Sequence, residues 1–308
     1  MIRRFFAAAA AVVLTSSIAS GCSTFSKNQQ AAKVDSTTLS VDDFETIADD
    51  FAVAGQITAP ASGEYNGSDQ RKLLTRWVFA QLLSHELDAA GTPIDSAARS
   101  AAEASLKQQA ADKWPALHPV TQEFLITELA AQDKLAASPA IPNADVEAAY
   151  NAGLTQSNTL CLRVIGFTDA TTANDAYEQI LGGESFADVA DANSADPSIG
   201  AGGVFTNSTT NSECSSANSL NAQIAQSLSQ TALNVPSAPI PLAASDGTQQ
   251  YYLFLQRPWS EVADAATPLV RQALVPSTAR TLVTGGHASV DSRYGMWNPG
   301  ALEVTPSR

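Results

Sequence analysis

The sequence predicts an α+β protein in which a helical part precedes a mixed part of strands and helices. Residues 34–142 begin with a short β-branched stretch and then carry apolar side chains at helical spacing, which indicates one strand followed by helices. Residues 143–257 instead read as strand, helix, helix, loop, helix and strand. A hinge with a proline at each end, at 139–142, separates the two patterns, so we expect the fold to change there.

Helix start and stop signals define the elements of the helical part. Ser40 is a favourable N-cap, because Asp42 and Asp43 follow in the first turn and apolar residues recur at helical spacing after them. Gly91 is a favourable stop for the second helix. The predicted elements are a strand at 34–39, a loop at 55–67, and helices that begin at Ser40, at Ser68 or Asp69, near Asp95 and at Val120.

The mixed part and the end of the chain show shorter elements. Asn143 caps a short helix, and a Gly-Gly pair ends the helix predicted at 173–181. The other predicted elements are strands at 160–167, 251–256 and 287–294, helices at 186–192, 221–230 and 262–274 (extended by 278–283), a loop at 200–211, and a loop-like end from Asn298.

Composition and charge exclude several classes of protein. The 308 residues have a formal net charge of −14 and a pI near 4.5, and no basic patch is visible, which excludes nucleic acid as a partner. The same acidity excludes electrostatic adhesion to anionic lipid. The low charged fraction of 16% and the abundance of Ala, Ser and Thr are typical of an exported protein with a soluble surface.

The N-terminus has the pattern of an export signal. Two arginines precede an apolar run at 5–14, which is too short to span a bilayer, and small residues follow up to Cys22. The string Ile18-Ala19-Ser20-Gly21-Cys22 resembles a bacterial lipobox, which predicts a signal peptide at 1–21 and a lipid on Cys22. The alternative is an ordinary signal peptide with an incidental cysteine. Residues 22–33 are small and polar and are expected to form a flexible tether.

Two cysteines remain once Cys22 is assigned to the lipid. Cys161 and Cys214 form one pair in an oxidising compartment, which favours a structural disulfide. The chain-entropy relation gives about 4 kcal/mol for a loop of this length. The alternatives are two unpaired thiols or a redox or metal pair. Two cysteines without a nearby histidine do not complete a zinc site.

Other catalytic chemistry finds little support in the sequence. The three histidines, His85, His118 and His287, lie on or beside segments of surface type, and Asp49-Asp50 reads as charge on a helix surface. The Gly-Gly pairs at 182–183 and 202–203 are turn glycines outside any phosphate-binding pattern. We therefore expect neither a metal nor a small-molecule cofactor.

Short motifs after Cys161 occur in an order that resembles the parvulin-type peptidyl-prolyl isomerases. The glycine and phenylalanine motifs are moderately specific alone, and their order and spacing strengthen the resemblance. The matching strings are Cys161-Leu162-Arg163-Val164-Ile165, Gly183-Glu184-Ser185-Phe186-Ala187, Ser194-Ala195-Asp196-Pro197, Gly202-Gly203, Pro239-Ile240 and the closing strand within 247–255.

The flanking segments extend the resemblance to foldases of the SurA and PrsA type. In those proteins a strand and a helical bundle precede the parvulin domain, and the C-terminal segment packs back onto the bundle. The resemblance implies a helical chaperone module at 34–142, a parvulin-like domain at 143–257, and a closing helix and strand at 258–308. We expect the C-terminal strand to pair with residues 34–39.

The resemblance places the pocket of the isomerase on four positions, and none of them is a histidine. The two histidine positions of the family fall on Arg163 and Tyr252, the aromatic position of the penultimate helix falls on Ile224, and the loop position falls on Asp196. The sequence holds no histidine between 161 and 257. An isomerase must bind the twisted amide better than the planar one. Because the family's histidines are replaced, the sequence leaves open whether this domain catalyses isomerisation.

These observations favour a chaperone or foldase that binds unfolded exported polypeptides and is held by its lipid on the outer face of the cell membrane. The alternatives are an active peptidyl-prolyl isomerase and a scaffold of the cell envelope. The expected partners are unfolded chains and the membrane, without nucleic acid.

Overall fold

The computed structural model describes residues 29–58, 65–195, 199–207, 211–219, 222–243, 247–283 and 286–307. The predicted signal peptide, Cys22 and Asp196 lie outside these ranges. Helices and strands are mixed along the chain, and the predicted α+β class is confirmed. The chain forms two compact units. Unit 1 comprises the described parts of 1–82, 103–128 and 284–308, and unit 2 those of 83–102 and 129–283. The expected domain bounds 34–142, 143–257 and 258–308 stay a prediction.

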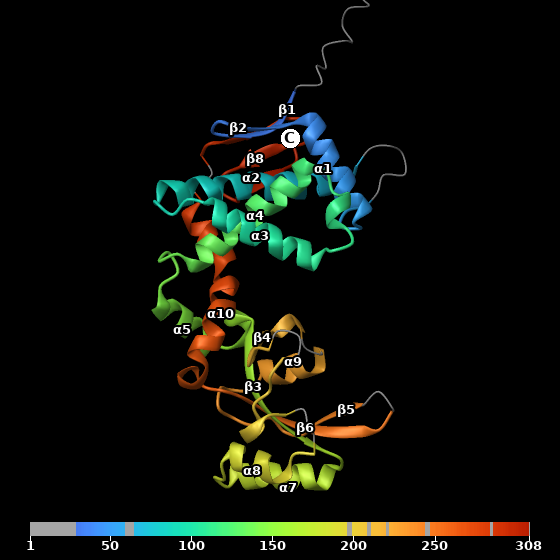
Figure 1. Cartoon of the computed structure of the whole chain (residues 1–308), viewed down its shortest axis with the longest axis vertical. Helices are drawn as coiled ribbons and strands as arrows, with labels where there is room; N and C mark the ends of the chain where they lie inside the picture. The colour runs from blue at the N-terminus through green and yellow to red at the C-terminus, as the bar shows by residue number, and fades with distance from the viewer. Residues whose placement is uncertain are drawn as a thin grey trace, which may run out of the picture. The chain divides into compact units, whose positions relative to one another are not determined.

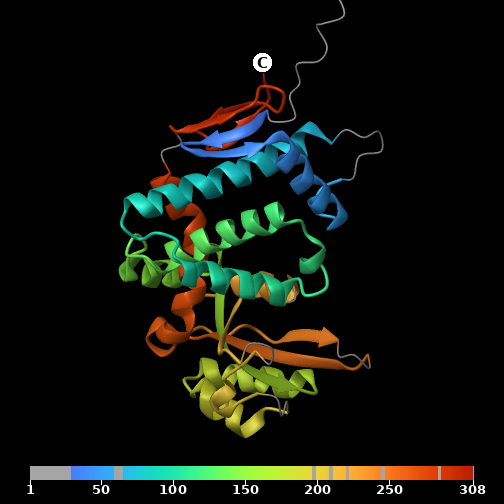
Figure 2. The same ribbon diagram turned by 45° about the horizontal axis from the view of Figure 1, so that its top comes forward.

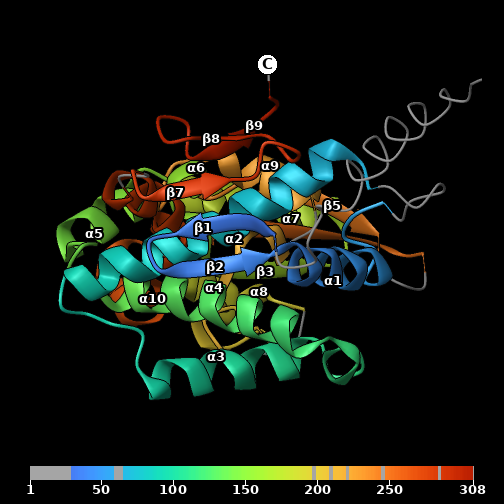
Figure 3. The same ribbon diagram turned by 90° about the horizontal axis from the view of Figure 1, so that it is seen from above.

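A three-stranded antiparallel sheet joins the start and end of the chain in unit 1. β1 (Gln30–Val34) lies between β2 (Thr37–Ser40) and β7 (Ala288–Val290). Figures 2 and 3 show the blue hairpin beside the red strand. The single strand predicted at 34–39 is wrong, because Asp35 takes a left-handed conformation (φ 49°) that turns the chain into a hairpin. The C-terminal strand does pair with this region, through β1.

Helix α1 (Val41–Val53) begins where the sequence predicts. The Ser40 side chain accepts a hydrogen bond from the Asp43 amide at 3.0 Å. The prediction of surface charge is wrong for Asp50, whose side chain is buried and accepts a hydrogen bond from the His118 amide at 2.9 Å. Burial raises the pKa of Asp50, but hydrogen bonds from residues around the start of α4, His118 among them, outweigh it and hold the pKa below its usual value. Asp50 therefore anchors the N-terminus of another helix.

Three long helices contribute residues to both units. They are α2 (Gly67–Ala89), α3 (Ser96–Gln109) and α4 (Pro119–Ala137), with the short helix η1 (Trp114–Ala116) before α4.

The end of the chain is not the predicted loop. Residues from Asn298 onward include β9 (Glu303–Thr305), which pairs with β8 (Met296–Asn298). The amide of Val304 donates to the Thr75 hydroxyl of α2 at 2.8 Å, and Val304 itself is buried. The last residues of the chain are thus part of the packing of unit 1.

Unit 2 contains a four-stranded antiparallel sheet with the order β4-β3-β6-β5. Its strands are β3 (Thr159–Phe167), β4 (Cys214–Ser216), β5 (Ile240–Ala243) and β6 (Gln249–Gln256), of which the sequence predicted the two long central ones. Figure 1 shows β3 and β6 with the β5 edge beyond them. β4 and β5 are too short to give a periodic signal.

The helices of unit 2 include one that is longer than predicted. α10 (Trp259–Leu282) continues through Pro268 and Pro276, because a buried stripe that includes Val262, Val270 and Val275 holds it in place. No helix in the described ranges has the length and apolar content needed to cross a bilayer. The remaining helices are α5 (Asn143–Asn151), α6 (Leu154–Ser157), α7 (Ala170–Leu181), α8 (Phe186–Asn193), η2 (Ala201–Gly203), η3 (Ala217–Ser219) and α9 (Ala222–Ser229).

Candidate functional site

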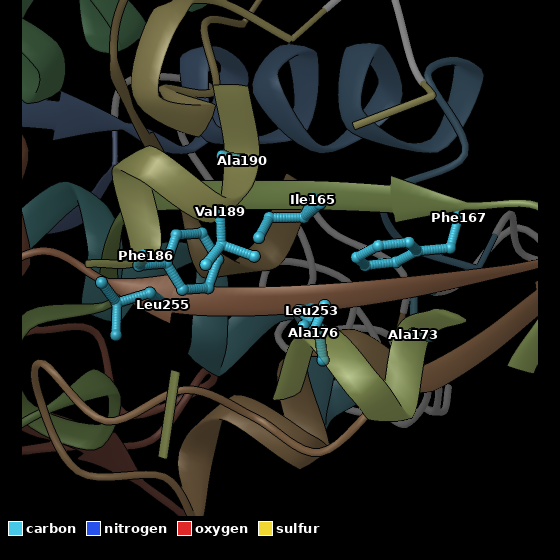
Figure 4. Packing of buried hydrophobic residues seen from close by; sticks show 9 residues of the cluster. All are labelled: Ile165, Phe167, Ala173, Ala176, Phe186, Val189, Ala190, Leu253 and Leu255. Carbon is cyan, nitrogen blue, oxygen red and sulfur yellow. The ribbon is translucent and has the colours of Figure 1, made fainter. Parts of the chain in front are cut away.

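The sheet of unit 2 has one face covered by helices. Side chains alternate along a strand, so residues two apart on β3 share a face. Ile165 and Phe167 pack with Leu253 and Leu255 of β6 against the helices α7 and α8. Figure 4 shows this cluster, whose buried members are Ile165, Phe167, Ala173, Ala176, Phe186, Val189, Ala190, Leu253 and Leu255. The helices α7 and α8 cover this face, and its buried members form an ordinary core.

The opposite face of the sheet is only partly covered. Its buried centre comprises Leu160, Leu162, Val164, Leu228, Ile240 and Phe254, and one helix, α9, contributes to it. Six large apolar side chains around this centre are half-buried: Leu154, Ile199, Phe205, Ile224, Leu242 and Tyr252. We call these six residues the α9 face. Half-buried apolar side chains grouped in this way can form a surface on which another apolar chain is buried.

Two of the four predicted pocket residues meet on the α9 face. Tyr252 stands on β6, opposite Ile240 of β5, and its ring stacks on Phe254 with 6.1 Å between centroids. Its hydroxyl donates to Gln250 Oε1 at 2.5 Å. Ile224 packs on the same buried centre from α9. Ile224 and Tyr252 thus pack against one buried cluster, and their role as pocket residues stays a prediction.

Arg163 lies on the other face of the sheet. It shares the side of β3 that carries Ile165 and Phe167, and its guanidinium donates to the Gly202 carbonyl at 2.7 Å and to Glu261 at 3.0 Å. The structure therefore does not bring Arg163 together with Tyr252 and Ile224. Leu162, the residue before it, points into the centre of the α9 face. Neighbouring side chains on a strand point to opposite faces of the sheet, and this alternation could have shown from the sequence that Leu162 and Arg163 lie on different faces.

The Gly202-Gly203 pair is required for the close approach of its loop to β3. Both glycines have positive φ, 63° and 76°. A Cβ on Gly203 would lie 2.8 Å from the Val164 carbonyl oxygen, and one on Gly202 would lie 2.8 Å from Arg163 Nη1. Only glycine fits both the conformation and the space. This motif of the sequence is thus structural.

Arg163 belongs to a network of charges at the start of α10. Arg257, with an 8% exposed side chain, donates to Glu213 at 2.6 Å and to Glu261 at 3.2 Å, and Arg163 shares Glu261. Burial raises the pKa of Glu261, but the hydrogen bonds from the two arginines outweigh it and hold the pKa below its usual value. Tyr150 of α5 completes the junction, because its hydroxyl donates to the Arg257 carbonyl at 2.8 Å. The network joins the sheet to α10.

The free energy of unfolding is expected to fall below about pH 5, because protonation of Glu261 breaks its bonds to both arginines. A carboxyl group whose pKa is lowered in the folded state stabilises the protein above its unfolded pKa, and this contribution is lost as the pH falls through the folded pKa. Glu261→Gln should flatten this part of the pH profile, and exposed Glu184→Gln should leave it unchanged. The measurement is the urea midpoint of unfolding of each protein at pH 7 and at pH 4. An equal fall of the midpoint between these two pH values for Glu261→Gln and for the wild type would contradict this role of Glu261.

The cysteine prediction is confirmed. Cys161 and Cys214 stand directly opposite each other on β3 and β4 and form a disulfide, with Cα atoms 4.2 Å apart. Asp196, the fourth predicted pocket residue, lies outside the described residues. Within the described ranges, no group of His, Cys, Asp and Glu has the arrangement of a metal site.

The chemistry open to the α9 face is binding. None of its six residues carries a charge, and the tyrosine hydroxyl is the one hydrogen-bonding side-chain group among them. The helices and strands that frame the face, α6, α9, β5 and β6, hold no Asp, Glu, Lys or Arg. Such a surface favours apolar, uncharged stretches of polypeptide over charged small molecules.

No protein-family description and no curated protein matches this sequence. The solved structures that it resembles include bacterial PrsA proteins. They include the foldase protein PrsA from Lactococcus lactis, which is 15% identical, covers 85% of this chain and 95% of its own, and has a TM-score of 0.32. PrsA from Bacillus subtilis is 15% identical over 86% and 96% of the two chains, with a TM-score of 0.30. The peptidylprolyl isomerase PrsA from Bacillus cereus is 16% identical over 87% and 96%, with a TM-score of 0.28.

Proposed function

We propose that this protein is a membrane-anchored chaperone that binds unfolded segments of exported polypeptides on the α9 face of unit 2. The observation that carries the proposal is the set of six uncharged, half-buried apolar side chains packed against the buried cluster that includes Leu162 and Phe254. The opposite face of the same sheet is covered by two helices, α7 and α8. Two of the similar solved structures are foldase proteins, and for this chain the proposal rests on the α9 face.

The expected affinity is modest and suits a reversible chaperone. Burying about 200 Å² of apolar surface at about 25 cal/mol/Å² gives about 5 kcal/mol. Part of this favourable free energy is offset, because the unfolded segment becomes ordered and loses its free motion on binding. Tight binding would trap the client, the unfolded chain, whereas weak binding at several points allows its release and refolding.

Suppression of aggregation by the mature chain tests the proposal. Ile224→Ser removes an apolar side chain from the α9 face and is expected to weaken suppression about fivefold, the effect of about 1 kcal/mol. Ile180→Ser is the matched control, because Ile180 is also half-buried but packs against the covered face of the sheet. Wild-type protein that fails to slow aggregation would contradict the proposal, as would equal effects of the two substitutions. Capture of one stoichiometric partner in place of many clients would favour an envelope scaffold.

A specific observation also keeps peptidyl-prolyl isomerisation as a second candidate. The Tyr252 hydroxyl is held by Gln250 at the edge of an apolar surface, where it can form a hydrogen bond with a twisted amide. The barrier to be lowered is about 18–20 kcal/mol. In a proline-isomerisation assay, catalysis that falls on Tyr252→Phe would support this activity, and a rate equal to the uncatalysed one would exclude it.

We also propose that Cys22 carries the lipid that anchors the chain to the outer face of the cell membrane. The support is the string Ile18-Ala19-Ser20-Gly21-Cys22 after a short apolar run. Labelled fatty acid should be incorporated into the wild-type protein and not into Cys22→Ser. Equal labelling of the two would contradict the assignment and leave an ordinary signal peptide as the alternative.

A further inference from the structure

The outer edge of the unit 2 sheet beyond β6 is formed by the segment 234–243. The amide of Asn234 donates to the Gln256 carbonyl at 2.9 Å, which places the start of the segment along the end of β6. The amide of Ser237 likewise donates to the Phe254 carbonyl at 2.8 Å. The segment ends in β5, the last strand in the order β4-β3-β6-β5. An unfolded chain that added a strand at this edge would therefore have to pair with 234–243.

Three prolines make this edge a poor partner for another strand. Pro236, Pro239 and Pro241 all lie within 234–243, and a proline has no amide hydrogen to donate. Pro241 is exposed and belongs to β5 itself, and its carbonyl accepts a hydrogen bond from the Gln223 side chain of α9 at 3.4 Å. Prolines on an edge strand are a common means of preventing the addition of another strand. The edge thus offers few backbone groups to a client.

The other edge of the sheet is engaged as well. The Leu162 carbonyl of β3 accepts a hydrogen bond from the Phe205 amide at 3.0 Å, and the Gly166 carbonyl accepts one from the Ala195 amide at 2.8 Å. The strand β4 forms the remainder of this edge and lies against α10. Backbone pairing with a client is therefore disfavoured at both edges of the sheet.

The α9 face itself offers side chains with little hydrogen-bonding capacity. The hydroxyl of Tyr252 already donates to Gln250 at 2.5 Å. A peptide group that is buried without a hydrogen bond costs free energy, so a client bound here keeps its backbone toward water and turns apolar side chains toward the face. Such contact depends on the shape and apolar character of the side chains. It does not depend on the direction in which the peptide bonds run.

We propose that the α9 face recognises the side chains of a client without regard to the direction of its chain and without hydrogen bonds to its backbone amides. The inference rests on the proposed function and deepens it, because it names the kind of segment bound: an unfolded apolar stretch in either chain direction, whether or not it can form a strand. Strand addition works differently, because main-chain hydrogen bonds then supply the affinity. Recognition by side chains alone suits a protein that binds many unrelated unfolded chains.

Three labelled peptides test the inference. The first is an apolar L-peptide, the second is its retro-inverso form, made of D-residues in reversed order, and the third is the L-peptide with N-methyl groups on alternate amides. The retro-inverso form keeps the arrangement of side chains and reverses the peptide bonds. Fluorescence anisotropy with the mature chain is expected to give dissociation constants within about threefold for all three. Strand addition would instead weaken the second and third peptides about tenfold, because main-chain hydrogen bonds are lost.

Two variants locate the binding of these peptides. Ile224→Ser removes an apolar side chain from the α9 face and is expected to weaken all three peptides alike, by about fivefold. Ile180→Ser is the matched control, because Ile180 is half-buried against the covered face of the sheet. It should leave the three affinities within about twofold of the wild type.

The outcomes separate this inference from the proposed function. A loss of more than about threefold for either modified peptide, while Ile224→Ser still weakens the L-peptide, would overturn the inference and leave the chaperone proposal standing. Binding of the modified peptides that Ile224→Ser leaves unchanged would overturn the assignment of this recognition to the α9 face. Binding of no peptide by the wild-type chain would overturn both proposals.

Discussion

Removal of residues 286–308 is expected to unfold unit 1. The deletion takes β7 from its place beside β1, removes Tyr294 from its edge contact with Phe44 (4.9 Å between centroids), and removes buried Val304. Each buried side chain contributes about 1.5–3 kcal/mol. The stabilisation lost with these side chains and with the hydrogen bonds of the sheet is comparable to the whole free energy of unfolding of a domain, about 5–15 kcal/mol.

Hydrogen exchange followed by mass spectrometry measures this effect. The amides of β1, β2 and α1 should lose protection in the shortened chain, whereas those of β3 and β6 should keep it. A chain that ends at Thr305 is the control, because it retains β9, and it should exchange like the wild type. Full protection of the β1 amides in the chain that lacks residues 286–308 would contradict a stabilising role of the C-terminal segment in unit 1.

Reduction of the Cys161–Cys214 disulfide is expected to lower the free energy of unfolding by about 4 kcal/mol. The bond closes a loop of 53 residues in the unfolded chain, and its loss raises the entropy of that state. Both half-cystines are buried and stand opposite each other in the sheet, so the folded state also loses a cross-strand contact. Urea midpoints with and without reductant give the difference.

A double variant, Cys161→Ala with Cys214→Ala, separates the bond from other effects of the reductant. Its midpoint should lie near that of the reduced wild type and should not respond to reductant. A wild-type midpoint that is unchanged by complete reduction would show that the bond does not constrain the unfolded chain.

Local signals predicted the long elements of this protein. The Ser40 cap and the apolar spacing after it located α1, and the β-branched and aromatic runs located β3 and β6. The hairpin at the N-terminus was missed because its turn depends on the left-handed conformation of Asp35, which asparagine and glycine signal more clearly.

Long-range packing decided what local signals could not. The helix predicted at 262–274 with an extension at 278–283 is one continuous helix, because buried Val275 and Ala279 hold α10 in place across Pro276. Asp50 looked like surface charge because its role depends on His118, 68 residues further along the chain. No local pattern in the sequence marks Asp50 and His118 as partners at this separation.

The candidate site was predicted in part for a related reason. The resemblance assigned pocket positions to Tyr252 and Ile224, and in the structure both side chains pack against the same buried cluster. It assigned a pocket position to Arg163, but a one-residue shift on a strand moves a side chain to the other face of the sheet. The neighbouring residue, Leu162, lies at the centre of the α9 face, and Arg163 instead joins the sheet to α10 through Glu261.

The most direct test of client binding on the α9 face compares two adjacent tyrosines. Tyr252 packs on the α9 face and Tyr251 on the covered face, and both are half-buried on the same strand. The measurement is the affinity of the mature chain for a permanently unfolded, reduced and alkylated protein, by fluorescence anisotropy. Client binding on the α9 face predicts that Tyr252→Ser weakens the affinity about fivefold or more, equivalent to about 1 kcal/mol, whereas Tyr251→Ser leaves it within about twofold of the wild type. Equal affinities of the two variants would contradict it.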